Sequence, residues 1–259
     1  MSGRTSPGEY AAMSALTPSS MPPMNPSLES AVIAQDDVRL QGSFPLQTEW
    51  LTADSLRFFV KRAIDLTGAL VGLMLLTPVM LVVALLIRID SGGPIIFRQL
   101  RRGYHGRLFW VLKFRTMMMG AEERLADLEN SNESGGGVLF KLRNDPRVTR
   151  LGKFLRQHSL DELPQLINVF WGEMSLVGPR PLQLRDSDRL LASNPEAYFR
   201  RLQVMPGLTG PWQVGGRSEV DYERMLELDL NYVASWSLSQ DLWIICKTFL
   251  VVLRRQGAY

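Results

Sequence analysis

Two adjacent carboxylates, Asp161 and Glu162, stand near the start of a segment that is otherwise mostly apolar, SLDELPQLINVFWGEMSLVGPRP at residues 159–181. A carboxylate pair can hold Mg²⁺, which prefers oxygen ligands and takes one or two carboxylates beside substrate phosphates. An aspartate can also attack phosphorus and form an acyl phosphate. Arg156 lies five residues upstream of Asp161 and Arg180 nineteen residues downstream, and guanidinium groups bind phosphate bidentately. These residue types together describe a diphosphate site at which the carboxylate pair could hold Mg²⁺.

Two structural explanations compete with this chemistry. Ser159 and Glu162 have the spacing of a capping box at a helix start, where acidic residues face the positive end of the helix dipole. Pro164 fits such a start, because a first-turn residue can lack an N–H at little cost. A salt-bridge network is the second explanation, since arginine beside carboxylate neutralises both charges. The capping box leaves Asp161 unexplained, and the residues alone leave the network and the diphosphate site both open.

Two further cations accompany a predicted β-hairpin. Alternating apolar residues around a glycine-bearing turn predict strands near 95–100 and 108–114. The second strand leads into Lys113 and Arg115, which join the predicted phosphate-binding residues. An amphipathic helix is then predicted over 147–158, and it delivers the chain to the two carboxylates.

One segment is long and apolar enough to cross a bilayer. Residues 66–87 form a run of 22 residues without a charge, against the roughly 20 that a spanning helix needs. Thr77-Pro78 lies at its midpoint, where proline would kink a helix, although membrane helices tolerate proline. Basic residues flank both ends and favour the cytoplasmic side, which indicates a helix that enters the membrane, bends and returns. Charge and proline alone leave re-entry and spanning both open.

The charge distribution points to a membrane surface or to phosphate ligands. The net charge of +3 combines ten basic and two acidic residues over 57–120 with two basic and six acidic residues over 1–56. Cations beside apolar residues suit anionic membranes or phosphate-bearing ligands. We expect no nucleic-acid partner, because no zinc-finger or RNP-like signature accompanies the charge. Cys246 is the only cysteine, so the sequence excludes an internal disulfide and a cysteine zinc cluster.

Four motifs resemble the bacterial sugar transferases, the small monotopic phosphoglycosyl transferases. They are KFRTM at 113–117, LRQHSLDELPQLINVFWGEMSLVGPRP at 155–181, PGLTGPWQVGGR at 206–217 and DLNYVASWSLSQDLWIICKT at 229–248. They follow the order found in that family, and the resemblance covers roughly residues 57–259.

The resemblance implies a reaction and roles for the residues. A sugar-1-phosphate moves from a UDP-sugar to undecaprenyl phosphate, UMP is released, and assembly of a lipid-linked glycan begins. Asp161 matches the family's nucleophile, which also helps to bind Mg²⁺, and Glu162 matches the proposed acid/base or metal-supporting partner. The chain's ending favours an exopolysaccharide-type enzyme acting on UDP-glucose or UDP-galactose. The predicted phosphate-binding residues are Lys113, Arg115, Arg156, Arg180 and Arg217.

The resemblance also implies an architecture. We expect an α+β, mostly helical fold with a re-entrant membrane helix over 57–90 and a cytoplasmic catalytic domain over 91–259. Residues 1–50 lie outside the resemblance, and their proline- and serine-rich composition predicts a disordered extension. The helix would be broken at Thr77-Pro78, which favours re-entry over spanning. A short β-hairpin and amphipathic interfacial helices complete the predicted fold. One of these helices begins at a capping box of Ser237 and Gln240, although an ordinary core helix fits that segment equally well.

These expectations place a monotopic protein on the cytoplasmic face of the inner membrane, in contact with membrane lipids. A homodimer is compatible with the sequence. The alternative function is a membrane-bound module that binds polyprenyl phosphate, or regulates, without turnover. The presence of Asp161, Arg156 and Arg180 together favours the enzyme.

Overall fold

The computed structural model describes residues 54–121, 124, 142, 144–217 and 220–254. The predicted extension over 1–50 lies outside the described residues. The elements in chain order are α3 (Asp54–Ser91), β1 (Ile96–Arg102), η2 (Tyr104–Gly106), β2 (Leu108–Phe114), α5 (Arg150–Gln157), η4 (Leu160–Glu162), α6 (Gln165–Trp171), β3 (Ser175–Val177), α7 (Leu184–Ser193), α8 (Pro195–Arg201), β4 (Gly207–Thr209), α9 (Pro211–Val214), α10 (Tyr222–Ser235) and α11 (Leu238–Leu253). A mostly helical α+β fold is confirmed.

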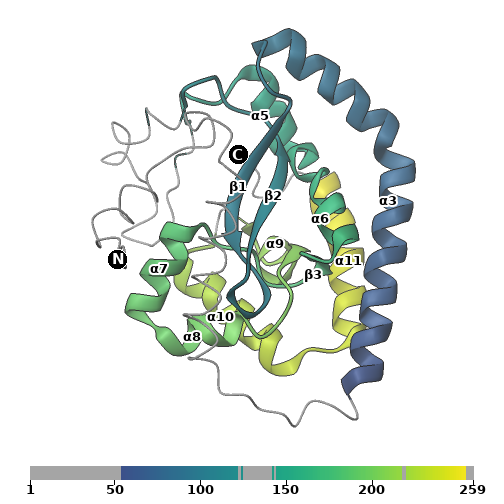
Figure 1. The fold of residues 1–259 in the computed structure, drawn as a ribbon, viewed down its shortest axis with the longest axis vertical. Helices are drawn as coiled ribbons and strands as arrows, with labels where there is room; N and C mark the ends of the chain where they lie inside the picture. The colour runs from purple at the N-terminus through teal and green to yellow at the C-terminus, as the bar shows by residue number, and fades with distance from the viewer. Residues whose placement is uncertain (1–53, 122–123, 125–141, 143, 218–219, 255–259) are drawn as a thin grey trace, which may run out of the picture.

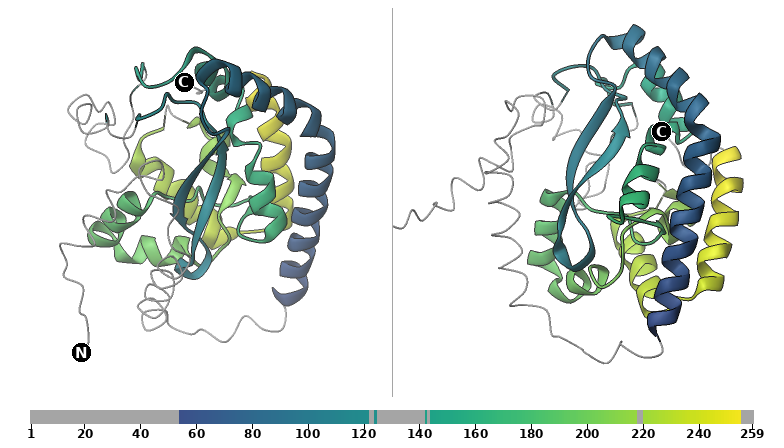
Figure 2. Two further views of the ribbon diagram at one scale, coloured as in Figure 1. Left: turned by 45° about the horizontal axis from the view of Figure 1, so that its top comes forward. Right: turned by 45° about the vertical axis from the view of Figure 1, so that its right-hand side comes forward.

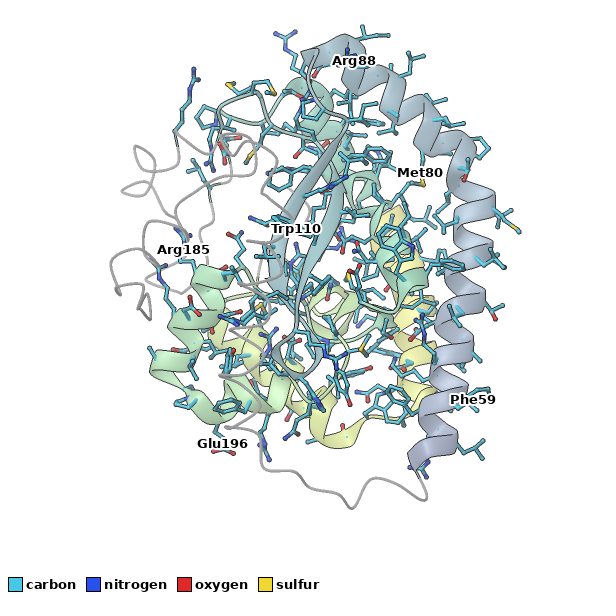
Figure 3. The ribbon with its side chains drawn as sticks, viewed as in Figure 1. Phe59, Met80, Arg88, Trp110, Arg185 and Glu196 are labelled. Atoms are coloured by element: carbon cyan, nitrogen blue, oxygen red, sulfur yellow. The ribbon has the colours of Figure 1, made fainter. Side chains whose placement is uncertain are left out.

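The apolar segment forms α3, a helix of 38 residues along one side of the molecule (Figure 1). It is long and apolar enough to cross a membrane, with a mean hydropathy of 2.8. The helix bends near Met80, just after Pro78 (Figure 3), because proline lacks an N–H and its ring clashes with the preceding turn. The Thr77 hydroxyl donates to the Leu73 carbonyl at 2.5 Å, and such back-bonding also bends helices.

Polar contacts fix both ends of α3 to the rest of the fold. Near its start, the Lys61 ammonium donates to Asp241 of α11 at 2.6 Å. Asp65 accepts from the Ser175 hydroxyl and from the Leu176 backbone N–H, both in β3. At its end, the Ser91 hydroxyl accepts from Arg115 at 2.6 Å. Figure 2 shows α11 running beside the first half of α3. Both ends of the long apolar helix are therefore docked on one folded unit.

The predicted hairpin is confirmed as the antiparallel pair β1 and β2, with Ile96 opposite Phe114 and Arg102 opposite Leu108. The connecting turn passes through His105, which has a left-handed φ of 52° and whose ring stacks on Tyr104. The hairpin lies across the face of the helical layer that faces the viewer in Figure 1. Its second strand carries Lys113 toward the two carboxylates.

A second strand pair, β3 and β4, was not predicted from the sequence. These strands of three residues pair in parallel, with Ser175 opposite Gly207 and Val177 opposite Thr209. A Cβ atom on Gly207 would lie 2.1 Å from the Gly178 nitrogen, so only glycine permits this close approach. The pair fixes the chain just before the turn that carries Arg180.

Apolar packing joins these elements in four buried clusters. Val83 and Ile87 of α3 pack with Phe114 and Leu155, so the second half of the long helix packs against the hairpin and α5. Another cluster contains Ala69 with residues of β2 and α6. The remaining two clusters hold α7, α8 and α10 together, and join α11 to β3. The turn η4, which carries Asp161 and Glu162, lies between α5 and α6. Leu160 and Leu163, at and just after this turn, pack against the cluster that contains Phe114 of the hairpin.

The three predicted helix starts have different outcomes. The helix expected over 147–158 is α5, which begins one residue after its cap, Thr149. Ser237 caps α11 by accepting from the Gln240 backbone at 3.2 Å, and the helix has the predicted length of about four turns. The capping box at Ser159 and Glu162 is wrong, because the Ser159 side chain makes no capping bond and its φ is 56°. Ser159 instead turns the chain out of α5.

Candidate active site

The two carboxylates lie in η4, a single 3₁₀ turn between α5 and α6. Ser159 adopts the left-handed conformation directly before this turn, which reverses the chain so that Asp161 and Glu162 both face the end of β2. A left-handed conformation in a residue other than glycine costs of the order of 1–3 kcal/mol and occurs most often at functional sites. Asp161 is 9% exposed. The turn is therefore strained and its carboxylates are largely shielded from solvent.

Glu162 is held by two cations from distant parts of the chain. Its carboxylate accepts from Lys113 of the hairpin at 2.7 Å and from Arg180 at 3.2 Å. Burial alone would raise the pKa of Glu162, but the charges and hydrogen bonds of Lys113 and Arg180 outweigh burial and hold this pKa far below its usual range. Direct contact with two cations therefore favours the ionised form of Glu162.

Asp161 differs from its neighbour. In the part of the chain that the structure describes, its carboxylate forms no hydrogen bond and no ion pair. Burial raises the pKa of Asp161, and the charge of Glu162 adds to this shift, while Lys113, Arg156 and Arg180 oppose it. Three cations thus act on Asp161 electrostatically, and none of them neutralises it by direct contact. The carboxylate is free to react or to bind a cation.

Two further arginines complete the positive surroundings of the turn. Arg156 of α5 donates its Nε to the Thr116 hydroxyl at 2.9 Å, and burial lowers its pKa while Asp161 raises it. Arg217 has a left-handed φ of 53°. Burial also lowers the pKa of Arg217, and Glu162 is the charge that most opposes this shift. Both guanidinium groups therefore lie within electrostatic range of the carboxylates.

The structure does not bring Arg115 to this site. Its guanidinium donates to Ser91 at the end of α3 and to the sulfur of Met119. Within β2, alternate side chains point to the same face, and this directs Lys113 toward the carboxylates. The strand ends at Phe114, so Arg115 lies outside this pattern and its side chain points elsewhere. Of the predicted set, Lys113, Arg156, Arg180 and Arg217 gather around the carboxylates and Arg115 stays with α3.

Sequence reasoning missed several residues that surround Arg180. The Arg180 guanidinium lies 5.1 Å from the centre of the Trp212 ring, and Arg101 is 8% exposed beside it. Burial lowers the pKa of Arg101 to about 9, and the charge of Arg180 adds to this shift. Arg201 and Asp229 form a buried ion pair at 2.7 Å. Trp212 and Asp229 belong to the quoted motifs, but nothing in their spacing indicated contact with this loop.

The geometry suits the transfer of an anionic group. A buried carboxylate without a partner lies among four cations, and one of these cations is stacked on an aromatic ring. Within the described residues there is no group of three or more His, Cys, Asp or Glu side chains that could hold a metal, which argues against a zinc-type site there. A single carboxylate that shares a cation with substrate phosphates is a different arrangement and suits Mg²⁺. The arrangement fits phosphoryl chemistry.

Comparison with known proteins agrees with this chemistry. The profile of a family described as "Bacterial sugar transferase" matches residues 56–255. A UDP-galactose-lipid carrier transferase of Erwinia amylovora is 45% identical over 204 residues, which are 78% of this chain and 42% of that protein. The exopolysaccharide production protein ExoY of Sinorhizobium fredii is 43% identical over 202 residues, 77% of this chain and 88% of that protein.

A third relative carries the name of a complete reaction. The UDP-glucose:undecaprenyl-phosphate glucose-1-phosphate transferase of Caulobacter vibrioides is 42% identical over 204 residues, 77% of this chain and 72% of that protein. The chain spans about two fifths of the length of several other curated relatives that it matches.

Proposed function

Since the chain belongs to the bacterial sugar transferase family, we propose that it transfers a sugar-1-phosphate from a UDP-sugar to undecaprenyl phosphate and releases UMP. The names of its relatives support this substrate pair, because they include phosphotransferases for galactose and for glucose on undecaprenyl phosphate. UDP-glucose and UDP-galactose are accordingly the first substrates to test. One observation carries the proposal: Asp161 is buried among cations and has no partner in the described residues.

The proposed reaction uses Asp161 twice. A carboxylate oxygen of Asp161 attacks the phosphorus that bears the sugar, the bond from that phosphorus to the bridging oxygen breaks, and UMP leaves with the electron pair. An oxygen of undecaprenyl phosphate then attacks the same phosphorus and regenerates the free Asp161 carboxylate. Arg156, Arg180 and Lys113 stabilise the charge on the transferring group, because buried and preorganised cations act strongly where charge develops.

The site also fits a bound Mg²⁺. The Asp161 carboxylate has no partner among the described residues, and Mg²⁺ is commonly held by one or two carboxylates together with substrate phosphates. Asp161 is the residue that would hold the ion, since Glu162 is already bonded to Lys113 and Arg180. When bound, the ion would neutralise charge on the diphosphate.

We further propose that α3 enters the inner membrane from its cytoplasmic face and returns, which makes the protein monotopic. Both ends of α3 are docked on the same folded unit, and Pro78 lies at the bend between them. Apolar side chains of α3 point away from that unit, such as Leu75 at 71% exposed and Ile89 at 73%. On α11, Trp243 and Leu253 are also exposed, which suits an interfacial helix. Residues 91–259 would then form the cytoplasmic catalytic domain.

The test is release of UMP by purified protein from UDP-glucose or UDP-galactose with undecaprenyl phosphate and Mg²⁺. Asp161→Asn should abolish turnover, because an amide cannot act as the nucleophile. The thermal unfolding temperature of this variant should not fall. Burial of the ionised Asp161 side chain raises its pKa, so the wild-type carboxylate destabilises the folded state above that pKa and the neutral amide does not. Asp188→Asn is the matched control, because the Asp188 side chain is 58% exposed and, within the residues the structure describes, pairs only with Arg102.

Incubation with a UDP-sugar alone should leave a phosphosugar on Asp161, detected by mass spectrometry of the intact protein. Wild-type protein that binds undecaprenyl phosphate but releases no UMP from either UDP-sugar would support a binding or regulatory module instead. More than a few per cent of wild-type activity in Asp161→Asn would contradict the covalent mechanism.

A further inference from the structure

The turn at Pro179–Pro181 presents Arg180 to Glu162. Its two prolines have no N–H, so the turn has few donors of its own with which to hold its shape. Instead each of its carbonyls accepts a hydrogen bond from a different part of the fold. These bonds are Gly207 N to Pro179 O at 2.9 Å, Arg201 Nη2 to Arg180 O at 2.8 Å and Arg101 Nη1 to Pro181 O at 2.7 Å.

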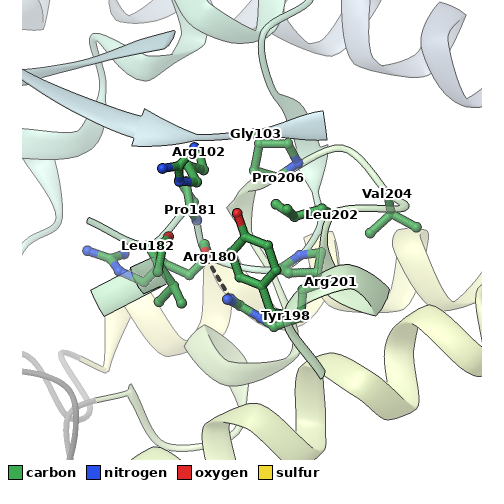
Figure 4. A pocket seen from close by; sticks show the side chains of 12 residues that line it. Arg102, Gly103, Arg180, Pro181, Leu182, Tyr198, Arg201, Leu202, Val204 and Pro206 are labelled. Atoms are coloured by element: carbon green, nitrogen blue, oxygen red, sulfur yellow. Dashed lines mark hydrogen bonds between the residues drawn. The ribbon is translucent and has the colours of Figure 1, made fainter. Parts of the chain in front are cut away.

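Arg201 makes one of these three bonds from a buried position. It is 7% exposed at the end of α8, and Figure 4 shows its bond to the Arg180 carbonyl as a dashed line. The same guanidinium donates twice to Asp229 of α10, at 2.7 and 3.1 Å. Asp229 is fully buried. A carboxylate on α10 therefore fixes an arginine on α8, which in turn fixes the backbone of Arg180.

Stability alone does not explain this ion pair. The desolvation of two buried charges consumes most of their mutual attraction, so apolar residues of similar volume often stabilise a fold as well or better. The bond from Arg201 to the Arg180 carbonyl is the contact that an apolar pair could not replace. This bond directs attention to the position of Arg180 rather than to the packing of α8 on α10.

A bound ligand does not explain Arg201 either. The cavity beside it is bounded by residues of the hairpin turn, α8 and the Arg180 turn (Figure 4). Its volume is about 20 Å³, which is room for about one water molecule. The enclosed part of the cavity is therefore too small to hold a whole sugar or nucleotide.

We propose that Arg201, oriented by Asp229, is a positioning residue that holds the Arg180 turn so that the Arg180 guanidinium meets the transferring phosphate. This inference rests on the proposed function, because it concerns the speed of phosphosugar transfer. In this role Arg201 acts through Arg180 and contacts neither the substrate nor the carboxylates of Asp161 and Glu162. Its effect on activity should therefore exist only while Arg180 is present.

The first experiment replaces the pair with apolar residues, Arg201→Met together with Asp229→Leu. The thermal unfolding temperature should stay the same or rise, because no buried charge is left without its partner. The kcat/KM for UMP release should fall roughly 10- to 100-fold, the loss that follows a small displacement of a catalytic group. Arg200→Met is the matched control on the same helix, since the Arg200 side chain is 53% exposed and its only ion pair in the described part of the chain is with Glu196. The kcat/KM of this variant should match the wild type.

The second experiment repeats the change in an Arg180→Ala background. If Arg201 acts through Arg180, the combined variant should match Arg180→Ala alone to within about twofold in kcat/KM. Losses that multiply would overturn the proposal, because they would show an effect independent of Arg180. Wild-type kcat/KM in a folded Arg201→Met/Asp229→Leu variant would overturn it as well.

A third variant covers failure of the apolar pair to fold. Arg201→Lys keeps a positive charge for Asp229, but an ammonium lacks the fork that serves two acceptors at fixed angles. Its kcat/KM should fall in the wild-type background and remain unchanged in the Arg180→Ala background, and any other pattern would overturn the proposal. Absence of UMP from the wild type itself would instead overturn the proposed function, so the two failures are distinguishable.

Discussion

Lys61→Met should destabilise the fold through Asp241, although these residues are 180 positions apart. Asp241 is 4% exposed and also accepts from the Tyr232 hydroxyl at 2.7 Å and from the Trp236 indole at 3.1 Å. Removing Lys61 leaves the Asp241 carboxylate buried without its cationic partner. Breaking a buried ion pair by deleting one partner costs about 3–5 kcal/mol. The two donors that remain place this loss near the lower end of that range.

Adding a second change should recover most of the lost stability. In Lys61→Met/Asp241→Asn the buried charge is gone, and the amide oxygen can still accept a hydrogen bond from Tyr232 or Trp236. What remains is the Val177 carbonyl, which loses Lys61 as a donor and shares the single Tyr232 proton with residue 241, at a cost of about 1 kcal/mol. The double variant should therefore be about 2 kcal/mol more stable than Lys61→Met alone.

Thermal unfolding in nanodiscs measures this difference. For a fold of about 200 residues, 1 kcal/mol shifts the midpoint by roughly 2–4 °C, so Lys61→Met should unfold roughly 6–12 °C below the wild type. Arg224→Met is the matched control, because Arg224 and Glu227 also pair at 2.6 Å but are each 55% exposed. An exposed pair contributes about 0–1 kcal/mol. Equal shifts for Lys61→Met and Arg224→Met, or no recovery in the double variant, would refute the reasoning.

Two further predictions concern the membrane helix and the carboxylate turn. With Cys246→Ser as the background, single cysteines at Arg57 and Asp90 should both resist an impermeant thiol reagent in intact cells and react after lysis; labelling of only one in intact cells would show a spanning helix. Glu162→Gln should move the acid limb of the kcat/KM profile to lower pH, because the charge of Glu162 raises the pKa of Asp161 and activity is lost as Asp161 gains a proton. An acid limb that stays in place would show that Asp161 is not the group that titrates.

Local sequence signals predicted the elements that are defined locally. The hairpin follows from alternation around a glycine-bearing turn, and α11 follows from Ser237 at its cap. The capping box at Ser159 failed because the same short pattern also fits a residue that ends one helix and turns the chain into the next. The left-handed φ of Ser159 depends on the packing of α5 against the hairpin, which a four-residue window does not contain.

Long-range contacts account for what the sequence could not predict. β3 and β4 have three residues each, too few for a periodic pattern, and they pair across 32 positions, as Ser175 with Gly207. Arg201 contacts the Arg180 turn from α8, and Asp229 of α10 bonds Arg201 in turn. Lys113 and Arg115 were indistinguishable in the sequence. Because β2 ends between them, Lys113 contacts the carboxylate of Glu162 and Arg115 contacts Ser91 of α3.

The different environments of two adjacent carboxylates assign their roles. Lys113 and Arg180 bond Glu162 directly and hold its pKa far below its usual range, which favours the ionised carboxylate over a group that exchanges a proton. We therefore expect it to hold those two cations in place beside Asp161, rather than to act as the acid or base that the family resemblance suggested. Asp161 has the opposite environment, since burial raises its pKa and no described residue pairs with it. Environments that push the pKa values of neighbouring groups apart separate the reacting group from the supporting one, and here they favour Asp161 as the nucleophile of the proposed reaction.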